Sequence, residues 1–212
     1  MDETVADGVD LTGGIAARLA SRCLDRRGRL RDFDLWDDAA RGALLVDLVR
    51  AERLVHGDDS VTVDGTPTGF GPADRLLAAM VAEPGRSLDD WMAVGPVGMP
   101  DVAGALVDSG RWTVRRRLLT RRFADVSAAS AADRARDPHR PDGTWTPETA
   151  TVVVLGLACG AYGRPEPIVE AELAPTGPLR WVCEAVTTHL ERAHRANLRS
   201  AGAADGGSVP YH

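Results

Sequence analysis

The stretch from Asp34 to Leu54 constrains the fold more than any other part of the chain, because it carries the strongest helix signal of the first half. Asp34, Asp37 and Asp38 supply a candidate cap and negative charge at its start. The apolar positions at helical spacing are Ala40, Leu44, Leu45, Leu48, Val49 and Ala51. We therefore predict a helix that is buried on most of its sides.

Arg41 does not fit this burial. It lies one turn inside the apolar part of the predicted helix, a few residues after Trp36. A permanently charged guanidinium in such a place needs an anion, a carbonyl oxygen or open water. One interpretation is a headgroup-binding corner formed with the indole. The other is an exposed arginine that pairs with Asp37 or Asp38 on the same helix.

Charge is distributed unevenly along the chain. All 25 basic residues are arginine, which favours a GC-rich bacterial source, and the net charge of -6 argues against wholesale coating of nucleic acid. Six arginines nevertheless fall between Arg111 and Phe123, a segment that reads as two strands around an arginine turn. We call this segment the arginine hairpin.

Three interpretations of the arginine hairpin stay open. Its exposed basic tip, flanked by Trp112, Leu118, Leu119 and Phe123, suits an anionic membrane surface. The helix predicted at 101–109, followed directly by a basic hairpin, also resembles a winged-helix DNA reader whose wing follows phosphates. The third interpretation is a solvated hairpin whose arginines pair with acidic surface residues.

The remaining pattern predicts a mainly α-helical single domain with small β-hairpins. We expect this domain at 11–199, between a flexible acidic tail at 1–10 and a disordered tail at 200–212. A second hairpin reads from Val55 to Gly65, with its turn at 57–60. Further helices are predicted at 15–24, 72–82, 88–92, 101–109, 147–161, 165–173 and 179–199.

Signatures of catalysis and of metal binding are missing from the sequence. It contains neither a Gly-x-Ser-x-Gly elbow nor a phosphate loop, and His189 and His194 are five residues apart rather than four. We therefore expect no enzyme, no cofactor and no metal. The three widely spaced cysteines suit reduced, buried thiols in a cytosol, and no apolar run reaches the ~20 residues that cross a bilayer. A soluble cytoplasmic protein is expected.

Several short motifs follow one another in a fixed order. They are Leu24-Asp25-Arg26-Arg27-Gly28-Arg29, Leu35-Trp36-Asp37-Asp38, Arg41-Gly42-Ala43-Leu44-Leu45, Thr66-Pro67-Thr68-Gly69, Asp89-Asp90-Trp91 and Leu106-Val107-Asp108-Ser109-Gly110. A late apolar helix from Val152 to Ala161 completes the series. In this order the chain resembles the Golgi phosphoprotein 3 family over roughly residues 11 to 195.

The resemblance implies a function and a set of site residues. Members of that family are mainly helical, and eukaryotic members bind phosphatidylinositol 4-phosphate peripherally while linking glycosyltransferases to coat proteins. The family's pocket tryptophan and arginine match Trp36 and Arg41, with a spacing shorter here by about one helical turn. Its other pocket arginines precede the Leu-Val-x-x-Gly segment, where this sequence has none from Pro96 to Asp101. The hairpin residues that are candidates to compensate are Arg111, Arg115, Arg116 and Arg117.

Together these observations predict a peripheral adaptor at the cytoplasmic face of a membrane. Its expected partners are an anionic phospholipid headgroup, by resemblance phosphatidylinositol 4-phosphate, and a protein cargo. The alternative is a winged-helix-like DNA-binding regulator that uses residues 101–123. Lipid binding would depend on Arg41 together with the hairpin, whereas DNA binding would depend on the 101–109 helix and the hairpin.

Overall fold

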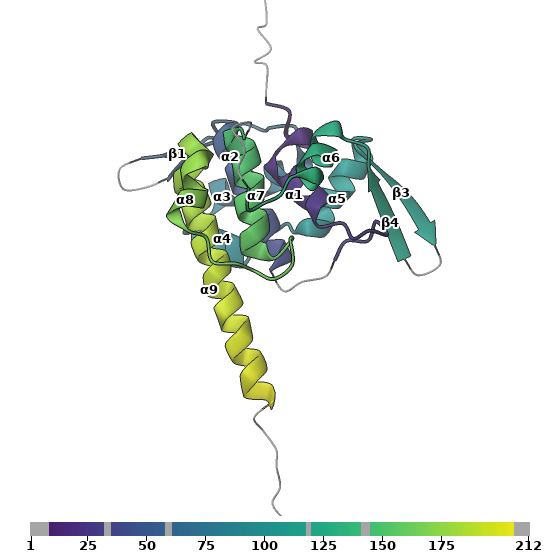
Figure 1. The fold of residues 1–212 in the computed structure, drawn as a ribbon. Coiled ribbons are helices and arrows are strands. Elements are labelled where there is room, and N and C mark those ends of the chain that lie inside the picture. The colour runs from purple at the N-terminus through teal and green to yellow at the C-terminus, as the bar shows by residue number, and fades with distance from the viewer. Residues whose placement is uncertain (1–8, 32–34, 58–60, 118–119, 141–144, 206–212) are drawn as a thin grey trace, which may run out of the picture.

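The computed structural model describes residues 9–31, 35–57, 61–117, 120–140 and 145–205 (Figure 1). Several predicted features lie outside these residues. They are the turn at 58–60, the tip of the arginine hairpin at 118–119, and most of both predicted tails. Within the described part of the chain, no helix is both long enough and apolar enough to span a bilayer.

The fold is mainly helical, with two small antiparallel sheets, as the sequence predicts. The helices are α1 (Ile15–Arg22), α2 (Trp36–Arg50), α3 (Gly71–Ala82), α4 (Leu88–Ala93), α5 (Met99–Asp108), α6 (Ala128–Ala135), α7 (Pro147–Cys159), α8 (Glu170–Leu173) and α9 (Arg180–Asp205), with 3-10 turns η1 (Leu11–Gly13) and η2 (Ala174–Leu179). The strands are β1 (Leu54–His56), β2 (Val61–Val63), β3 (Trp112–Arg117) and β4 (Thr120–Asp125).

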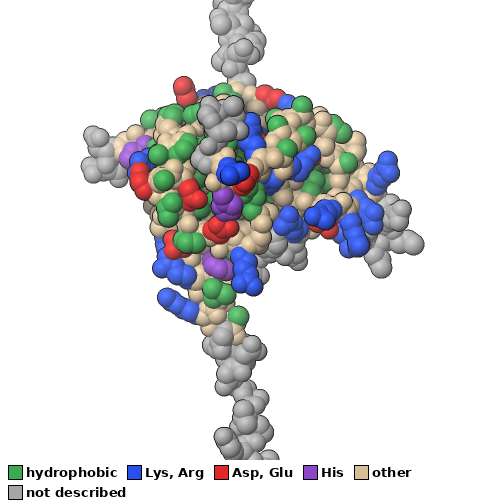
Figure 2. All heavy atoms as spheres, in the orientation of Figure 1, with side chains coloured by type: hydrophobic (Ala, Val, Ile, Leu, Met, Phe, Trp, Pro, Cys, Tyr) green, Lys and Arg blue, Asp and Glu red, His purple; other side chains and the backbone are tan. Residues whose placement is uncertain are grey.

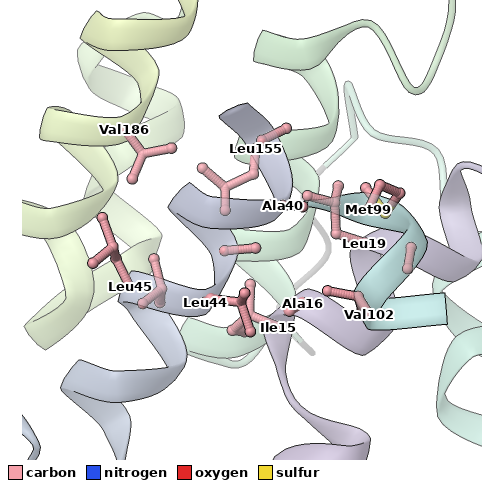
Figure 3. Packing of buried hydrophobic residues seen from close by; sticks show 14 of the residues in the cluster. Ile15, Ala16, Leu19, Ala40, Leu44, Leu45, Met99, Val102, Leu155 and Val186 are labelled. Carbon is pink, nitrogen blue, oxygen red and sulfur yellow. The ribbon is translucent and has the colours of Figure 1, made fainter. Parts of the chain in front are cut away.

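Helix α2 is buried almost all round, which confirms the first prediction. It contacts α1, α3, α4, α5, α7 and α9. Figure 3 shows its side chains Leu44 and Leu45 among residues of these neighbouring helices. Gly42 allows α9 to approach closely, because a Cβ atom there would lie 2.4 Å from Val186 Cγ1. The core therefore forms around α2.

Asp47 joins α2 to the start of α1. Helix α1 begins after Gly14, which has no side chain to cap it, and the Asp47 carboxylate accepts the Ile15 N–H at 2.8 Å and the Ala16 N–H at 2.9 Å. Arg50 donates to the same carboxylate at 3.1 Å. Burial raises the pKa of Asp47 to about 6, although these donors favour its charged form. A buried carboxylate thus replaces the missing local cap.

Local cap signals locate several helix starts correctly. The Ser87 side chain accepts from the N–H of Asp90 at the start of α4, and Thr146 accepts from the N–H of Thr149 at the start of α7. The predicted start of α5 at residue 101 is wrong: the helix begins at Met99, and Asp101 lies at its third position, where it accepts the Gly98 N–H at 2.8 Å. Helix α9 continues to Asp205, beyond the predicted end near Arg199, and extends past the helical body (Figure 1).

Both predicted hairpins form. In the first, Leu54 pairs with Val63 and His56 with Val61. In the arginine hairpin, β3 pairs with β4 from Trp112 opposite Asp125 to Arg117 opposite Thr120. The predicted arginine turn is wrong, because residues 115–117 belong to strand β3. The arginines thus occupy paired positions along a ladder.

Replacing Asp47 by Asn tests the buried cap. An amide of the same shape presents an NH₂ group where one carboxylate oxygen accepted a main-chain N–H, so a buried donor loses its partner. We expect Asp47→Asn to lower the free energy of unfolding in urea at neutral pH by about 2 kcal/mol. The control is Asp108→Asn, at an exposed position at the end of α5. Equal free energies of unfolding for Asp47→Asn and Asp108→Asn would show that the contact of Asp47 with the start of α1 contributes nothing to stability.

Candidate functional site

Arg41 lies inside the protein with 6% of its surface exposed. Its Nε donates to the Met92 carbonyl at 2.6 Å, and Nη1 donates to the Val97 carbonyl at 3.0 Å. Nη2 donates to the Ala93 carbonyl at 3.2 Å and to Asp38 Oδ1 at 2.6 Å. Four of its five N–H groups are therefore used inside the protein, and three of them hold α2 to the end of α4 and the loop that follows.

The predicted headgroup corner is not an open pocket in this structure. Trp36 is buried in the core with Arg41, and the chain at Gly95 presses on the arginine stem. A Cβ atom on Gly95 would lie 2.5 Å from Arg41 Cδ. The alternative prediction of an exposed Arg41 that pairs with Asp37 or Asp38 is confirmed in its partner, Asp38, and wrong in its exposure, because Arg41 is buried. Asp37 instead accepts the Met99 N–H at 2.9 Å. A headgroup-gripping role of Arg41 stays a prediction that this geometry does not favour.

His189 of α9 completes the same cluster. Its side chain is 5% exposed, with Nε2 at 3.0 Å from Asp38 Oδ2 and Nδ1 at 2.7 Å from Asp89 Oδ1. Arg192 donates to the other oxygen of Asp89 at 2.7 Å. We call Asp38, Arg41, Asp89 and His189 the α2–α4 corner. In it, charges from α2, α4 and α9 satisfy one another.

Sequence analysis missed the role of His189. Burial, the largest single contribution, lowers the pKa of His189, but its hydrogen bonds to Asp38 and Asp89 together raise that pKa above the ordinary 6.5. His189 is 100 residues from Asp89 and 151 from Asp38 along the chain. The only local sign of this cluster was that Asp38 and Asp89 both lie in the first turn of a helix. Helix α9 brings the His189 imidazole to both of them.

The arginine hairpin has the opposite electrostatic character. Arg115 lies directly opposite Arg122, and Arg116 lies directly opposite Arg121. Because directly opposed residues share a face, each pair places like charges side by side, which destabilises a ladder. Arg115 and Arg121 are exposed, and none of the ion pairs among the described residues involves Arg115, Arg121 or Arg122.

Arg111 is separate from this group. It stands just before β3, where its Nη2 donates to Asp10 Oδ2 at 2.8 Å and its Nε donates to Thr12 Oγ1 at 3.1 Å. It therefore ties the hairpin base to η1. Trp112 is buried, and its ring lies 5.5 Å from that of Phe123 between centroids. The base of the hairpin is thus anchored in the core.

The predicted site residues fall into two groups that the structure does not bring together. Trp36 and Arg41 belong to the buried core, whereas Arg115, Arg116 and Arg117 follow one strand of the hairpin. Figure 2 shows basic side chains gathered on the side of the molecule that carries the hairpin. Among the described residues, no cluster of three His, Cys, Asp or Glu side chains is arranged to hold a metal ion.

Comparison with known proteins gives one match. Residues 22–191 match the family model described as Golgi phosphoprotein 3 (GPP34). No curated protein matches the chain. The matched range includes the α2–α4 corner and the arginine hairpin.

The raised pKa of His189 predicts a pH dependence of stability. A raised pKa in the folded state means that this stabilisation is complete below the ordinary 6.5 and is lost as the pH rises through the folded-state pKa. At about pH 6, His189→Gln should lower the free energy of unfolding by about 2 kcal/mol, and this difference should shrink towards about pH 9. Urea unfolding of the wild type and of His189→Gln across this pH range measures the difference in free energy.

His194→Gln on the same helix is the control, because in the described structure His194 has no carboxylate partner. It should leave the pH dependence of the wild-type protein unchanged. A pH-independent difference between wild type and His189→Gln would contradict a charged His189 in the α2–α4 corner.

Proposed function

Because this chain belongs to the Golgi phosphoprotein 3 family, we propose that it binds anionic lipid headgroups peripherally, through the arginine hairpin, and acts as an adaptor. The family consists in general of non-enzymatic lipid-binding adaptors. The proposal places the protein at the cytoplasmic face of a membrane, with a protein cargo as its second partner. The cargo rests on the family resemblance alone.

One observation carries this proposal: Arg115 lies directly opposite Arg122, and among the described residues no acidic side chain pairs with Arg115, Arg121 or Arg122. Each directly opposed arginine pair is unfavourable in the free protein, and an anionic surface removes the repulsion. An arginine near such a surface contributes about 1 kcal/mol. The five hairpin arginines from Arg115 to Arg122 therefore supply at most about 5 kcal/mol of attraction, because successive positions of a strand point to opposite faces, and salt weakens this attraction.

The rigid base of the hairpin supports this interpretation. Because Trp112 is buried and Phe123 packs on it, the strands are held in a defined position relative to the helical body. Arginines fixed on paired strands lose less conformational freedom on binding than arginines on a loose tail. The hairpin is thus suited to bind a surface without refolding.

Phosphatidylinositol 4-phosphate is the proposed headgroup by family resemblance. The geometry supports binding to an anionic surface better than it supports recognition of this one headgroup, because Arg41 uses four N–H groups inside the protein. In the proposal, Arg115, Arg116 and Arg117 contact phosphate and Arg111 positions the hairpin base, whereas Trp36 and Arg41 stay buried in the core. A preference for this lipid would need a second group of phosphate ligands.

The DNA-binding alternative is less well supported. A winged-helix reader inserts the helix before its wing into the major groove. Here that helix is α5, which contains no basic residue and carries Asp101 and Asp108. Asp108 is exposed, and Asp101 pairs with Arg75 at 2.7 Å. A helix with this charge would repel the phosphates that flank a groove.

Co-sedimentation with vesicles tests the proposal. We compare the wild-type chain with the triple variant Arg115→Gln, Arg116→Gln and Arg117→Gln, using neutral vesicles, phosphatidylserine vesicles, and phosphatidylinositol 4-phosphate vesicles at matched charge. Three arginines at about 1 kcal/mol each predict that the triple variant binds anionic vesicles about a hundredfold more weakly. Wild-type binding should also fall as salt rises.

The matched control removes the same charge elsewhere. It carries Arg75→Gln, Arg195→Gln and Arg199→Gln, all at exposed positions outside the hairpin. This variant should bind within about twofold of wild type. Equal loss in both triple variants, or no binding of the wild type to any anionic vesicle, would refute the proposed function.

A further inference from the structure

The turn that follows α1 is a second basic element. Its backbone is closed by a bond from the Asp25 N–H to the Arg29 carbonyl at 2.8 Å and by a bridge between Leu24 and Leu30. Asp25 Oδ1 also accepts the N–H groups of Arg27 at 2.7 Å and Arg29 at 2.8 Å. These bonds lower the pKa of Asp25. The one carboxylate of the turn is therefore used to shape it.

This turn lies directly against strand β4. The Phe123 N–H donates to the Gly28 carbonyl at 2.7 Å. A Cβ atom on Gly28 would lie 2.3 Å from the Phe123 carbonyl oxygen, and Gly28 has φ of 73°, so this approach needs glycine. Arg29 and Arg122 each stand next to one partner of this hydrogen bond. We call this contact between Gly28 and Phe123 the turn–strand seam.

Two charged donors at the seam have no acceptor. The Nε atoms of Arg29 and Arg122 are both buried and without a hydrogen-bond partner. Within the described residues, no ion pair involves either guanidinium. Buried donors of charged groups are normally satisfied, and leaving them unpaired is costly. Arg29 follows Gly28 in the chain and Arg122 precedes Phe123, so the backbone of both residues lies at the seam.

The surroundings of the seam favour an anion. Arg115 lies opposite Arg122 in the ladder and therefore on the same face. Arg26 and Arg27 are exposed on the turn. Guanidinium groups hold phosphate through paired N–H donors, which a flexible point charge does not match. The residues at the seam thus supply donors and charge of the kind that a phosphate group binds.

We propose that the turn–strand seam is a phosphate-binding subsite in which Arg29 and Arg122 donate to one phosphate group, with Arg115 completing its charge. This inference deepens the proposed function, because a membrane bound by the hairpin would offer headgroup phosphate to the seam. The ligand is a phosphate group, carried either by a lipid headgroup or by a free phosphate compound. The subsite would supply the second group of ligands that a headgroup preference requires.

Arginine side-chain NMR tests the subsite directly in the full chain. Inorganic phosphate is titrated against chloride at matched ionic strength while the Nε–H resonances are followed. The Arg29 and Arg122 resonances should shift together and saturate with phosphate but not with chloride. The Arg75 resonance, from a guanidinium paired with Asp101, is the internal control and should not saturate with them.

Arginine-to-lysine variants test whether Arg29 and Arg122 bind the same phosphate group. Arg29→Lys and Arg122→Lys keep the charge but remove the fork, so either one should weaken phosphate binding at least about tenfold and move the shift at the other residue to at least about tenfold higher phosphate. If chloride and phosphate shift the Arg29 and Arg122 resonances of the wild type equally, the proposed subsite is refuted, and no variant is needed to show it.

Vesicles of phosphatidylserine, and vesicles of phosphatidylinositol 4-phosphate at matched charge, separate the two proposals. Vesicle binding by the wild type without a saturable phosphate shift would refute the subsite and leave the proposed function standing. A saturable shift without vesicle binding would refute the membrane function and identify free phosphate as the source. Loss of preference for phosphatidylinositol 4-phosphate in Arg29→Lys would identify the lipid headgroup.

Discussion

Burial of α2 is the constraint on which the rest of the structure depends. A helix surrounded by other helices must satisfy its charged residues inside the protein. Asp47 does so by accepting the N–H groups at the start of α1, and Arg41 does so by donating to the carbonyls at the end of α4. A carboxylate thus faces a helix start and a guanidinium faces a helix end, the arrangement that helix dipoles favour. These two contacts position the neighbours of α2.

The same constraint divides the charged residues into those that hold the fold together and those that remain free to bind a ligand. The charges of the α2–α4 corner compensate one another, with His189 between two carboxylates, so little donor capacity is left there for a ligand. Along the hairpin the situation is reversed, because Arg115 lies opposite Arg122 and no carboxylate among the described residues pairs with either of them. A protein of net charge -6 therefore carries one surface suited to phosphate. We infer that anion binding lies at the hairpin rather than beside α2.

Local sequence patterns predicted most of the fold. The α2 stripe, the starts of α4 and α7, and the pairing of both hairpins depend on residues close together in the chain, where spacing determines contact. Partners at long range could not be read in this way: Arg41 meets carbonyls 51 and 56 residues away. The sequence likewise identified the hairpin arginines but not their cross-strand register, nor the contact of Gly28 with Phe123 that adds a second basic segment.

Hydrogen–deuterium exchange of the full chain with and without phosphatidylinositol 4-phosphate vesicles tests most directly where the anion binds. Our account predicts slower exchange at residues 24–31 and 111–125 in the presence of vesicles, because the turn and the hairpin contact the surface. It predicts unchanged exchange at 36–41 and 91–98, which form the α2–α4 corner and the loop against it. Slower exchange at that corner, with the hairpin unaffected, would contradict the account and restore Arg41 as the headgroup ligand.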